Sequence, residues 1–261
     1  MGDPSLPWLH AVEWQWCFVI QRVTTPVTEV GMPRRPLTPR PTAHGLIEPV
    51  HPAVFDYLAT LHRRHDEPVL LEMEREAETR GFPIVGRVVG AFLEVMALAV
   101  GARRVFELGS GYGYSAYWFS RAVGAGGTVI CTDGKAEHAR QARAYLERVG
   151  RWERIDFRVG WAQDVFRAVD GPFDVIYNDV DKGDYPEVWR LARERVCPGG
   201  LYIADNTLWY GRVVQDKVVD DVEPGWTEAI REHNRAIADD PDYDCFLNPI
   251  RDGVIVARRK V

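Results

Sequence analysis

The hydrophobic pattern changes character near residue 101 of this 261-residue chain. Between residues 53 and 99, apolar residues recur every three or four positions among charged ones, which is the spacing of helices with one buried face. The pattern predicts two amphipathic helices over residues 53–80. A third helix is expected from Pro83 to Ala99, where Gly101 ends it.

Beyond residue 101, short apolar runs alternate with helical stretches. This alternation is typical of a parallel sheet covered by helices on both faces, so the predicted fold class is α/β. The apolar runs predict strands at residues 104–108, 128–132, 155–159, 173–179, 201–205 and 254–257, with a weaker strand near 245–247. Helices are expected at residues 114–123, 136–149, 162–169, 185–196 and 226–238.

The first 50 residues lack this periodicity. Seven prolines lie between residues 24 and 52, interleaved with arginine and threonine, so helix and sheet are both poorly supported. We predict an irregular, proline-rich extension over residues 1–50 and one domain over residues 51–261, with helices up to residue 100 and an α/β core from residue 101. Met32 is an alternative initiator, which would leave residues 1–31 without a role.

Composition narrows the class of protein. The chain is 46% hydrophobic and 27% charged, as expected for a soluble globular protein, and its net charge of -6 disfavours sequence-independent binding of nucleic acid. No apolar run reaches the ~18 residues of a membrane-spanning helix, and the tryptophan-rich start lacks the features of a signal peptide. The four cysteines lie far apart and show none of the short spacings of zinc sites or redox motifs. We therefore expect them to be small residues of the core, in a protein of the reducing cytoplasm. They are Cys17, Cys131, Cys197 and Cys245.

A glycine-rich turn, from Glu107 to Ser115, links the first predicted strand to the next helix. Glycines let a backbone approach a ligand closely, and a helix N-terminus offers free N–H groups to an anionic group. Tyr114 occupies the place of the third glycine of a dinucleotide fingerprint, which counts against NAD and FAD. The alternative interpretation of the turn is tight packing. Asp133, at the end of the next strand, suits the ribose hydroxyls of a nucleoside, or else caps a turn.

Polar residues also follow two later strands. Asp179 comes at the end of one apolar run, and Asp205 and Asn206 at the end of another. Because the carboxyl ends of parallel strands open onto one crevice, these three oxygen donors can converge on a hard divalent cation such as Mg²⁺. Lys182, near such a cation, is a candidate to remove a proton from a coordinated hydroxyl. Turn capping and a solvated lysine are the alternatives.

Several motifs together resemble the cation-dependent O-methyltransferases, which include catechol and caffeoyl-CoA O-methyltransferases. The likeness runs from about Pro52 to Lys260 and implies a class I methyltransferase fold, with a seven-stranded, mostly parallel sheet whose last strand is antiparallel. The motifs are Phe82-Pro83-Ile84-Val85, Glu107-Leu108-Gly109 with Gly113-Tyr114-Ser115, Gln163-Asp164, Phe173-Asp174, Asp179 to Lys182 with Tyr185, Pro198-Gly199-Gly200, and Asp205-Asn206-Thr207-Leu208-Trp209 with Gly211-Arg212-Val213.

The resemblance also implies roles for individual residues. It implies that Asp179, Asp205 and Asn206 hold the cation, which can be Mg²⁺, Mn²⁺ or Ca²⁺, and that Lys182 is the base. It further implies that Ala162 and Gln163 lie near the adenine of S-adenosylmethionine and that Val85 closes over the methionine part. The residues that it implies for the S-adenosylmethionine site are Val85, Glu107, Gly109, Ser110, Ser115, Asp133, Ala162, Gln163 and Asp179.

Three residues after the predicted metal ligands can form a wall for a flat acceptor. They are Trp209, Tyr210 and Arg212, and the alternative is an ordinary packed loop. The sequence departs from the family in its more glycine-rich loop, in Val180 and in Gly134, none of which removes a needed donor.

We therefore expect methyl transfer from S-adenosylmethionine to a hydroxyl of a small, phenolic or catechol-like acceptor by a cytoplasmic homodimer. One alternative acceptor is a hydroxylated uridine of tRNA, which the arginines at residues 34, 35 and 40 would favour and the acidic net charge disfavours. Another alternative is a non-catalytic protein that binds S-adenosylmethionine.

Overall fold

The structure is a computed structural model that describes residues 50–62, 67–216, 218 and 221–261, all within one compact unit, residues 37–261. The predicted extension, Met32, Cys17 and the arginines at residues 34, 35 and 40 lie outside the described residues. The domain boundary at residue 50 stays a prediction.

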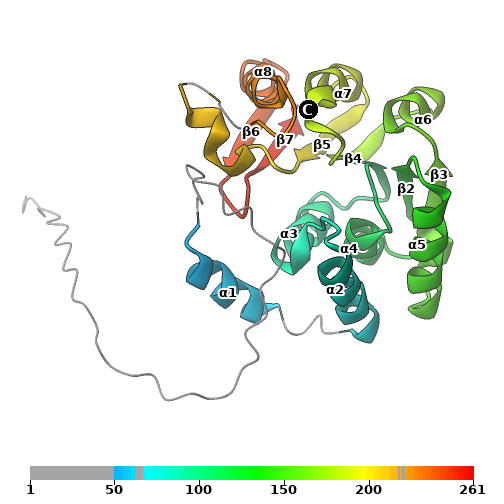
Figure 1. The fold of residues 1–261 in the computed structure, drawn as a ribbon. Helices are drawn as coiled ribbons and strands as arrows, with labels where there is room; N and C mark the ends of the chain where they lie inside the picture. The colour runs from blue at the N-terminus through cyan, green and yellow to red at the C-terminus, as the bar shows by residue number, and fades with distance from the viewer. Residues whose placement is uncertain (1–49, 63–66, 217, 219–220) are drawn as a thin grey trace, which may run out of the picture. The chain divides into compact units, whose positions relative to one another are not determined.

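One seven-stranded sheet organises the described residues (Figure 1), in the order β3-β2-β1-β4-β5-β7-β6. The strands β1 to β5 pair in parallel, whereas β7 is antiparallel to both β5 and β6. The predicted mostly parallel sheet is confirmed. The strands are β1 (Arg104–Leu108), β2 (Thr128–Asp133), β3 (Ile155–Val159), β4 (Phe173–Asn178), β5 (Val196–Ala204), β6 (Tyr243–Asn248) and β7 (Val254–Arg259).

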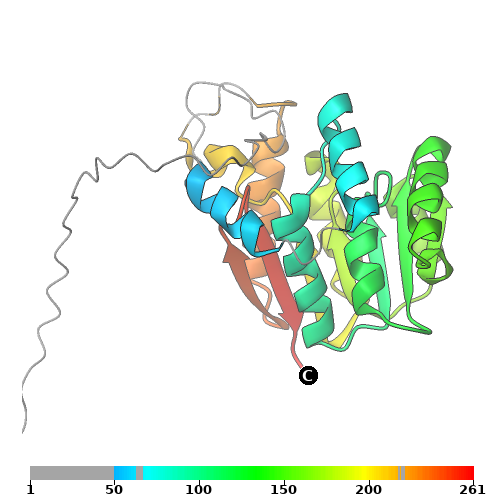
Figure 2. The same cartoon turned by 90° about the horizontal axis from the view of Figure 1, so that it is seen from below.

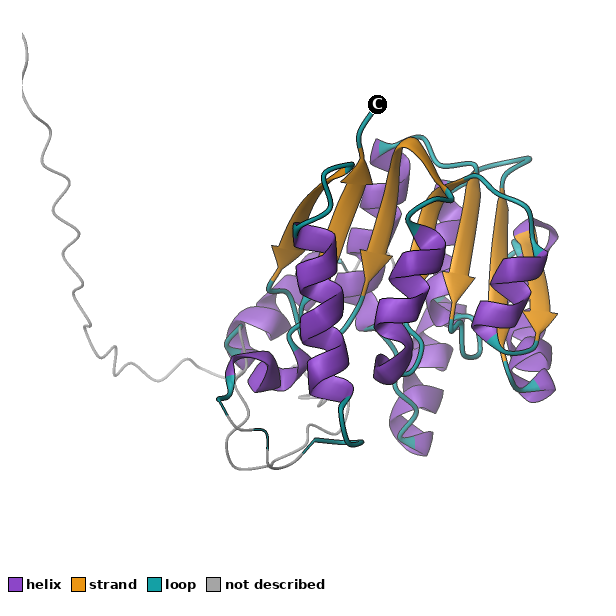
Figure 3. Ribbon diagram, turned by 90° about the horizontal axis from the view of Figure 1, so that it is seen from above, coloured by secondary structure: helices purple, strands orange, loops and turns teal. Residues whose placement is uncertain are grey.

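Helices cover both faces of the sheet, as Figures 1 and 3 show. The helices α3, α4 and α5 lie on one face, seen from below in Figure 2, and α6, α7 and α8 lie on the other. Each face packs its own apolar cluster against the sheet. The helices are α1 (Pro52–Leu61), α2 (Pro68–Arg80), α3 (Gly86–Ala99), α4 (Tyr114–Ala122), α5 (Ala136–Arg148), α6 (Ala162–Ala168), α7 (Tyr185–Ala192) and α8 (Trp226–Ala238). None of the helices among the described residues is long and apolar enough to cross a membrane.

Three predicted boundaries are wrong by three residues or more. The helix expected from Pro83 begins at Gly86, whose φ of 73° is left-handed and does not continue a helix. The helix expected to reach Val196 ends at Ala192, and β5 begins at Val196 rather than at Leu201. An irregularity in the β4–β5 pairing, between Phe173 and Val175, takes the Pro-Gly-Gly segment into the strand.

The cysteines only partly match the expected core positions. Cys131 is buried and Cys197 is half-buried, but Cys245 is exposed on the edge strand β6, so the core prediction is wrong for Cys245. These three cysteines are free thiols.

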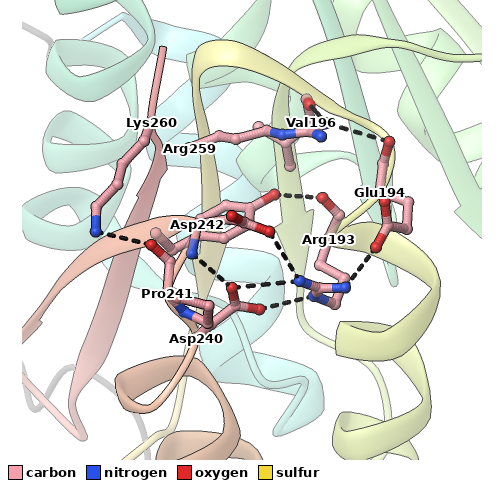
Figure 4. Close-up of polar contacts among 9 residues, drawn as sticks. Arg193, Glu194, Val196, Asp240, Pro241, Asp242, Arg259 and Lys260 are labelled. Carbon is pink, nitrogen blue, oxygen red and sulfur yellow. Dashed lines mark hydrogen bonds and ion pairs between the residues drawn. The ribbon is translucent and has the colours of Figure 1, made fainter.

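A cluster of charged side chains lies at the end of the sheet opposite the carboxyl ends of the parallel strands (Figure 4). Arg193, after α7, pairs through Nε with Asp240 Oδ2 at 2.7 Å and through Nη2 with Asp242 Oδ2 at 3.3 Å. Arg259 donates to the Val196 carbonyl at 2.7 Å. The cluster thus joins the α8–β6 turn to the start of β5, away from the candidate site described next.

Candidate active site

The carboxyl ends of three neighbouring strands meet at one cavity of about 520 Å³. Backbone hydrogen bonds tie these ends together, from Asp179 N to Leu108 O at 2.9 Å and from Asp205 N to Asn178 O at 3.2 Å. A volume of this size suits a small organic ligand. The predicted residues that line the cavity are Val85, Gly109, Ser110, Ser115, Asp133, Ala162, Gln163, Asp179, Lys182, Asp205, Asn206, Trp209 and Tyr210.

The glycine-rich turn lies on the β1 side of this cavity and is fixed to β2. Ser110 N donates to Thr132 O at 2.8 Å, and Thr132 N donates to Ser110 Oγ at 3.1 Å. Gly109 has a φ of 87°, and a Cβ there would lie 2.4 Å from the Asp179 carbonyl oxygen. Close packing is therefore confirmed at Gly109, and the same packing places the turn against Asp179 on the cavity wall.

Glu107 lies beneath the turn and does not line the cavity. Its side chain is fully buried, and neither carboxylate oxygen has a partner with hydrogen-bond geometry. Burial raises the pKa of Glu107 to about 7, although the nearby Ser110 and Ser115 hydroxyls favour the charged form.

Asp133 and Gln163 line the cavity, and each already makes hydrogen bonds within the protein. Asp133 Oδ1 accepts from Lys135 N at 2.7 Å and lies 2.9 Å from His138 Nδ1, so the turn-capping interpretation of Asp133 is confirmed for that oxygen. Gln163 Nε2 donates to Asp184 Oδ2 at 2.7 Å. Both side chains nevertheless line the cavity.

Lys182 and Asp179 form an ion pair at the end of β4. Lys182 Nζ lies 3.0 Å from Asp179 Oδ1 and 3.0 Å from the Val180 carbonyl oxygen, and 5.1 Å from the centre of the Tyr185 ring. Lys182 is only 8% exposed, which contradicts the solvated-lysine alternative. Burial raises the pKa of Asp179, Lys182 opposes that shift, and Asp205 reinforces it.

Asp205 pairs with an arginine that the sequence did not indicate. Arg251, in the turn between β6 and β7, places Nη1 2.6 Å from Asp205 Oδ2, while Asp205 Oδ1 is buried without a hydrogen-bond partner. Asn206 Nδ2 donates to Asp252 Oδ2 at 3.4 Å, and burial raises the pKa of Asp252 to about 7. No periodicity or spacing marks Arg251, because it is a single turn residue 46 positions from Asp205.

Trp209 and Tyr210 form an aromatic wall of the cavity, and hydrogen bonds hold Trp209 from outside it. Trp209 Nε1 donates to Asp221 Oδ1 at 3.0 Å, and Asp221 also accepts from the Thr227 backbone and hydroxyl, each at 2.9 Å. Arg212 does not line the cavity. Its guanidinium lies 5.7 Å from the Trp209 ring centre and 5.9 Å from that of Tyr210, so Arg212 supports this wall from outside the cavity.

Backbone conformations with positive φ also gather at this cavity. Among the described residues, four other than glycine have positive φ, and all four line the cavity. Such conformations cost energy and cluster at functional sites. They are Asn206, Trp209, Tyr210 and Arg251.

The donor set fits a hard cation in its chemistry. Asp179, Asp205 and Asn206 provide oxygen donors, and the buried Asp205 Oδ1 has no partner. The described part of the chain has no cluster of three or more His, Cys, Asp or Glu side chains arranged as a metal site, since this set has two carboxylates and one amide. Lys182 and Arg251 pair with the two carboxylates.

This fold and cavity define a class I methyltransferase, and comparisons with known proteins give the family. The family model described as O-methyltransferase matches residues 62–260. A catechol O-methyltransferase of Niastella koreensis is 32% identical over 170 residues, which cover 63% of this chain and 76% of the relative. A caffeoyl-CoA O-methyltransferase of Eucalyptus globulus is 30% identical over 177 residues, which cover 65% and 72%.

Solved structures of similar fold point to the same family. The Bacillus cereus O-methyltransferase, solved in complex with SAH, has a TM-score of 0.71 and 28% identity, covering 80% of this chain and 97% of its own. The chain therefore belongs to the family of S-adenosylmethionine-dependent O-methyltransferases.

Proposed function

We propose that this protein transfers a methyl group from S-adenosylmethionine to a hydroxyl of a small, catechol-like acceptor, with a divalent cation held by Asp179, Asp205 and Asn206 and with Lys182 as the general base. The observation that supports this proposal most strongly is the convergence of Lys182 and the three oxygen donors on the cavity that the glycine-rich turn borders. A protein that only bound the cofactor would not need a buried lysine there.

Lys182 is positioned for proton removal. Its amine donates to Asp179 Oδ1 and to the Val180 carbonyl. An unprotonated amine has two N–H donors, which these two acceptors satisfy, and its lone pair is then available to the acceptor hydroxyl. When bound, a divalent cation would favour ionisation of that hydroxyl as a Lewis acid.

The transfer itself needs few chemical groups from the protein. The acceptor oxygen forms the new O–CH3 bond while the S–CH3 bond breaks, sulfur keeps the electron pair, and the hydroxyl proton passes to Lys182. Gly109, Asp133 and Gln163 would orient the cofactor, and Trp209 with Tyr210 would orient a flat acceptor. Orientation of this kind contributes up to roughly 7 to 11 kcal/mol in model reactions.

The charge of the cavity favours a neutral acceptor. Five acidic side chains line it and two basic ones, Lys182 and Arg251, among the described residues. This balance disfavours polyanions such as a coenzyme A ester or RNA. The acidic side chains are Asp133, Asp179, Asp181, Asp184 and Asp205.

A test with labelled S-adenosylmethionine separates these possibilities. Catechols, hydroxycinnamoyl-CoA esters and tRNA are offered as acceptors, each with Mg²⁺ and with excess chelator. We expect turnover on catechols that chelation abolishes and Mg²⁺, Mn²⁺ or Ca²⁺ restores. Undiminished turnover in excess chelator would refute the proposed need for a divalent cation. Methyl transfer to tRNA alone would refute the proposed small, catechol-like acceptor.

We also propose a homodimer in the cytoplasm. Exposed apolar side chains on α1 and α3 support a contact between copies, since such groups favour burial. Light scattering of the purified chain would show about twice the mass of one chain if this proposal is right. The side chains are Val54, Tyr57, Leu61, Val95 and Leu98.

A further inference from the structure

The turn between β6 and β7 brings a guanidinium into the proposed cation site. Arg251 Nη1 lies 2.6 Å from Oδ2 of Asp205, whose side chain is only 1% exposed. Arg251 retains 22% exposure, so its head is withdrawn from most of the solvent. This contact therefore joins two opposite charges in a largely desolvated place, where such a pair is strong.

The turn is fixed against the segment that carries the proposed ligands. Thr207 N donates to Gly253 O at 3.0 Å, and Leu208 N donates to Asp252 O at 2.9 Å. A Cβ at Gly253 would lie 2.7 Å from Leu208 N, so the two backbones are in direct contact. The position of Arg251 is consequently set by the backbone beside Asp205.

Arg251 and a divalent cation require the same carboxylate. Lys182 already donates to Asp179, so a cation held between Asp179 and Asp205 would meet one occupied oxygen on each carboxylate. The Arg251 guanidinium occupies Oδ2 of Asp205. Only its departure from Asp205 frees both oxygens of that carboxylate.

We propose that Arg251 is the resident counter-charge of Asp205 and competes with the divalent cation for this carboxylate, so that the guanidinium and the cation each weaken the other's binding to Asp205. This inference rests on the cation site of the proposed function. It makes cation affinity lower than the oxygen donors alone would give. It also keeps Asp205 neutralised when no cation is bound.

The test measures Mn²⁺ binding by electron paramagnetic resonance on the full chain, with S-adenosylhomocysteine present and no acceptor, so that turnover plays no part. Arg251→Gly removes the guanidinium, and glycine accepts the φ of 53° at this position without strain. Arg251→Met is a second neutral variant that keeps most of the side-chain volume. Arg251→Lys keeps the charge, and Arg158→Gln removes a guanidinium that pairs with Asp156 on β3.

We expect both neutral variants to bind Mn²⁺ at a concentration roughly tenfold lower than the unmodified protein, the size of effect that about 1.4 kcal/mol produces. Arg251→Lys and Arg158→Gln should bind like the unmodified protein. Equal affinity in the unmodified protein and the neutral variants would overturn the inference and leave the cation site intact. Absence of binding in every protein would overturn the cation site itself, and the inference with it.

Discussion

Gly109 and Asp179 are in backbone contact, so close that a Cβ on Gly109 would lie 2.4 Å from the Asp179 carbonyl oxygen. The contact joins the glycine-rich turn after β1 to the end of β4. Any side chain at Gly109 therefore shifts the strand end that carries Asp179 and, three residues later, Lys182.

Gly109→Ala should lower the free energy of unfolding by more than about 2 kcal/mol, because it combines this overlap with a left-handed φ. Gly134→Ala is the matched control, since Gly134 also lines the cavity but nothing lies within 4 Å of its added Cβ and its φ is not positive. Its effect should stay within about 0.5 kcal/mol. Urea unfolding measures both, and equal losses would contradict the packing argument.

Lys182→Ala should separate binding from chemistry. We expect kcat on a catechol to fall by about 10² to 10⁴, the usual contribution of a positioned base, while the Kd for S-adenosylmethionine changes little. Lys260→Ala is the control, because Lys260 lies in the cluster at the opposite edge of the sheet (Figure 4). Turnover that survives in the Lys182 variant would rule out this lysine as the base.

Glu107 should make the stability of the cofactor-free protein depend on pH. Its pKa is raised from 4.5 to about 7 on folding, so between these values the folded state keeps a proton that the unfolded state has released. Stability therefore falls as pH rises through this window, by about 3 kcal/mol in total.

Glu107→Gln removes this dependence. The variant should gain about 3 kcal/mol relative to the unmodified protein when the pH is raised from 4.5 to above 7. The difference between the two proteins, measured by urea unfolding at each pH, cancels the contribution of Asp252, whose pKa is also raised to about 7. A difference that does not vary with pH would show that Glu107 is ionised in the folded state.

Asp221→Ala should loosen the aromatic wall of the cavity without touching the cofactor side. It removes the partner of Trp209 Nε1 and of two Thr227 donors. We expect the KM for a catechol to rise roughly tenfold, the effect of losing about one charged hydrogen bond, with an unchanged Kd for S-adenosylmethionine. Asp244→Ala, at an exposed site on β6, is the control. A weakened cofactor affinity would instead indicate general disruption.

Local patterns were sufficient for most of the fold. Strands β1 and β3 begin and end where their apolar runs predict. The core selects the apolar side chains of β1, whereas β3 lies at the sheet edge and is only partly buried. The start of β5 was missed, since Pro198, Gly199 and Gly200 indicate a turn in isolation. Pairing with β4 through an irregular register extends the strand over them, and such pairing is not local information.

The candidate site likewise contains residues that the sequence predicts and residues that it does not. Asp179 and Asp205 end neighbouring parallel strands, so topology alone predicts that they meet. Arg251 reaches this cavity from a turn, and Asp221 reaches Trp209 from a loop behind the cavity wall. A loop residue carries no periodic signal of its direction. Arg212 was expected on the acceptor wall, but it lies behind Trp209 because the chain turns through consecutive positive φ values there.

The place of β7 between β5 and β6 has a consequence for biosynthesis. Until residues 254–259 have left the ribosome, β5 is an edge strand, and the backbone N–H groups of Thr207 and Leu208 lack their partners in the β6–β7 turn. The wall of the cavity that the glycine-rich turn and Lys182 form is synthesised earlier. In a growing chain this wall therefore exists before Arg251 and the β6–β7 turn, which complete the cavity.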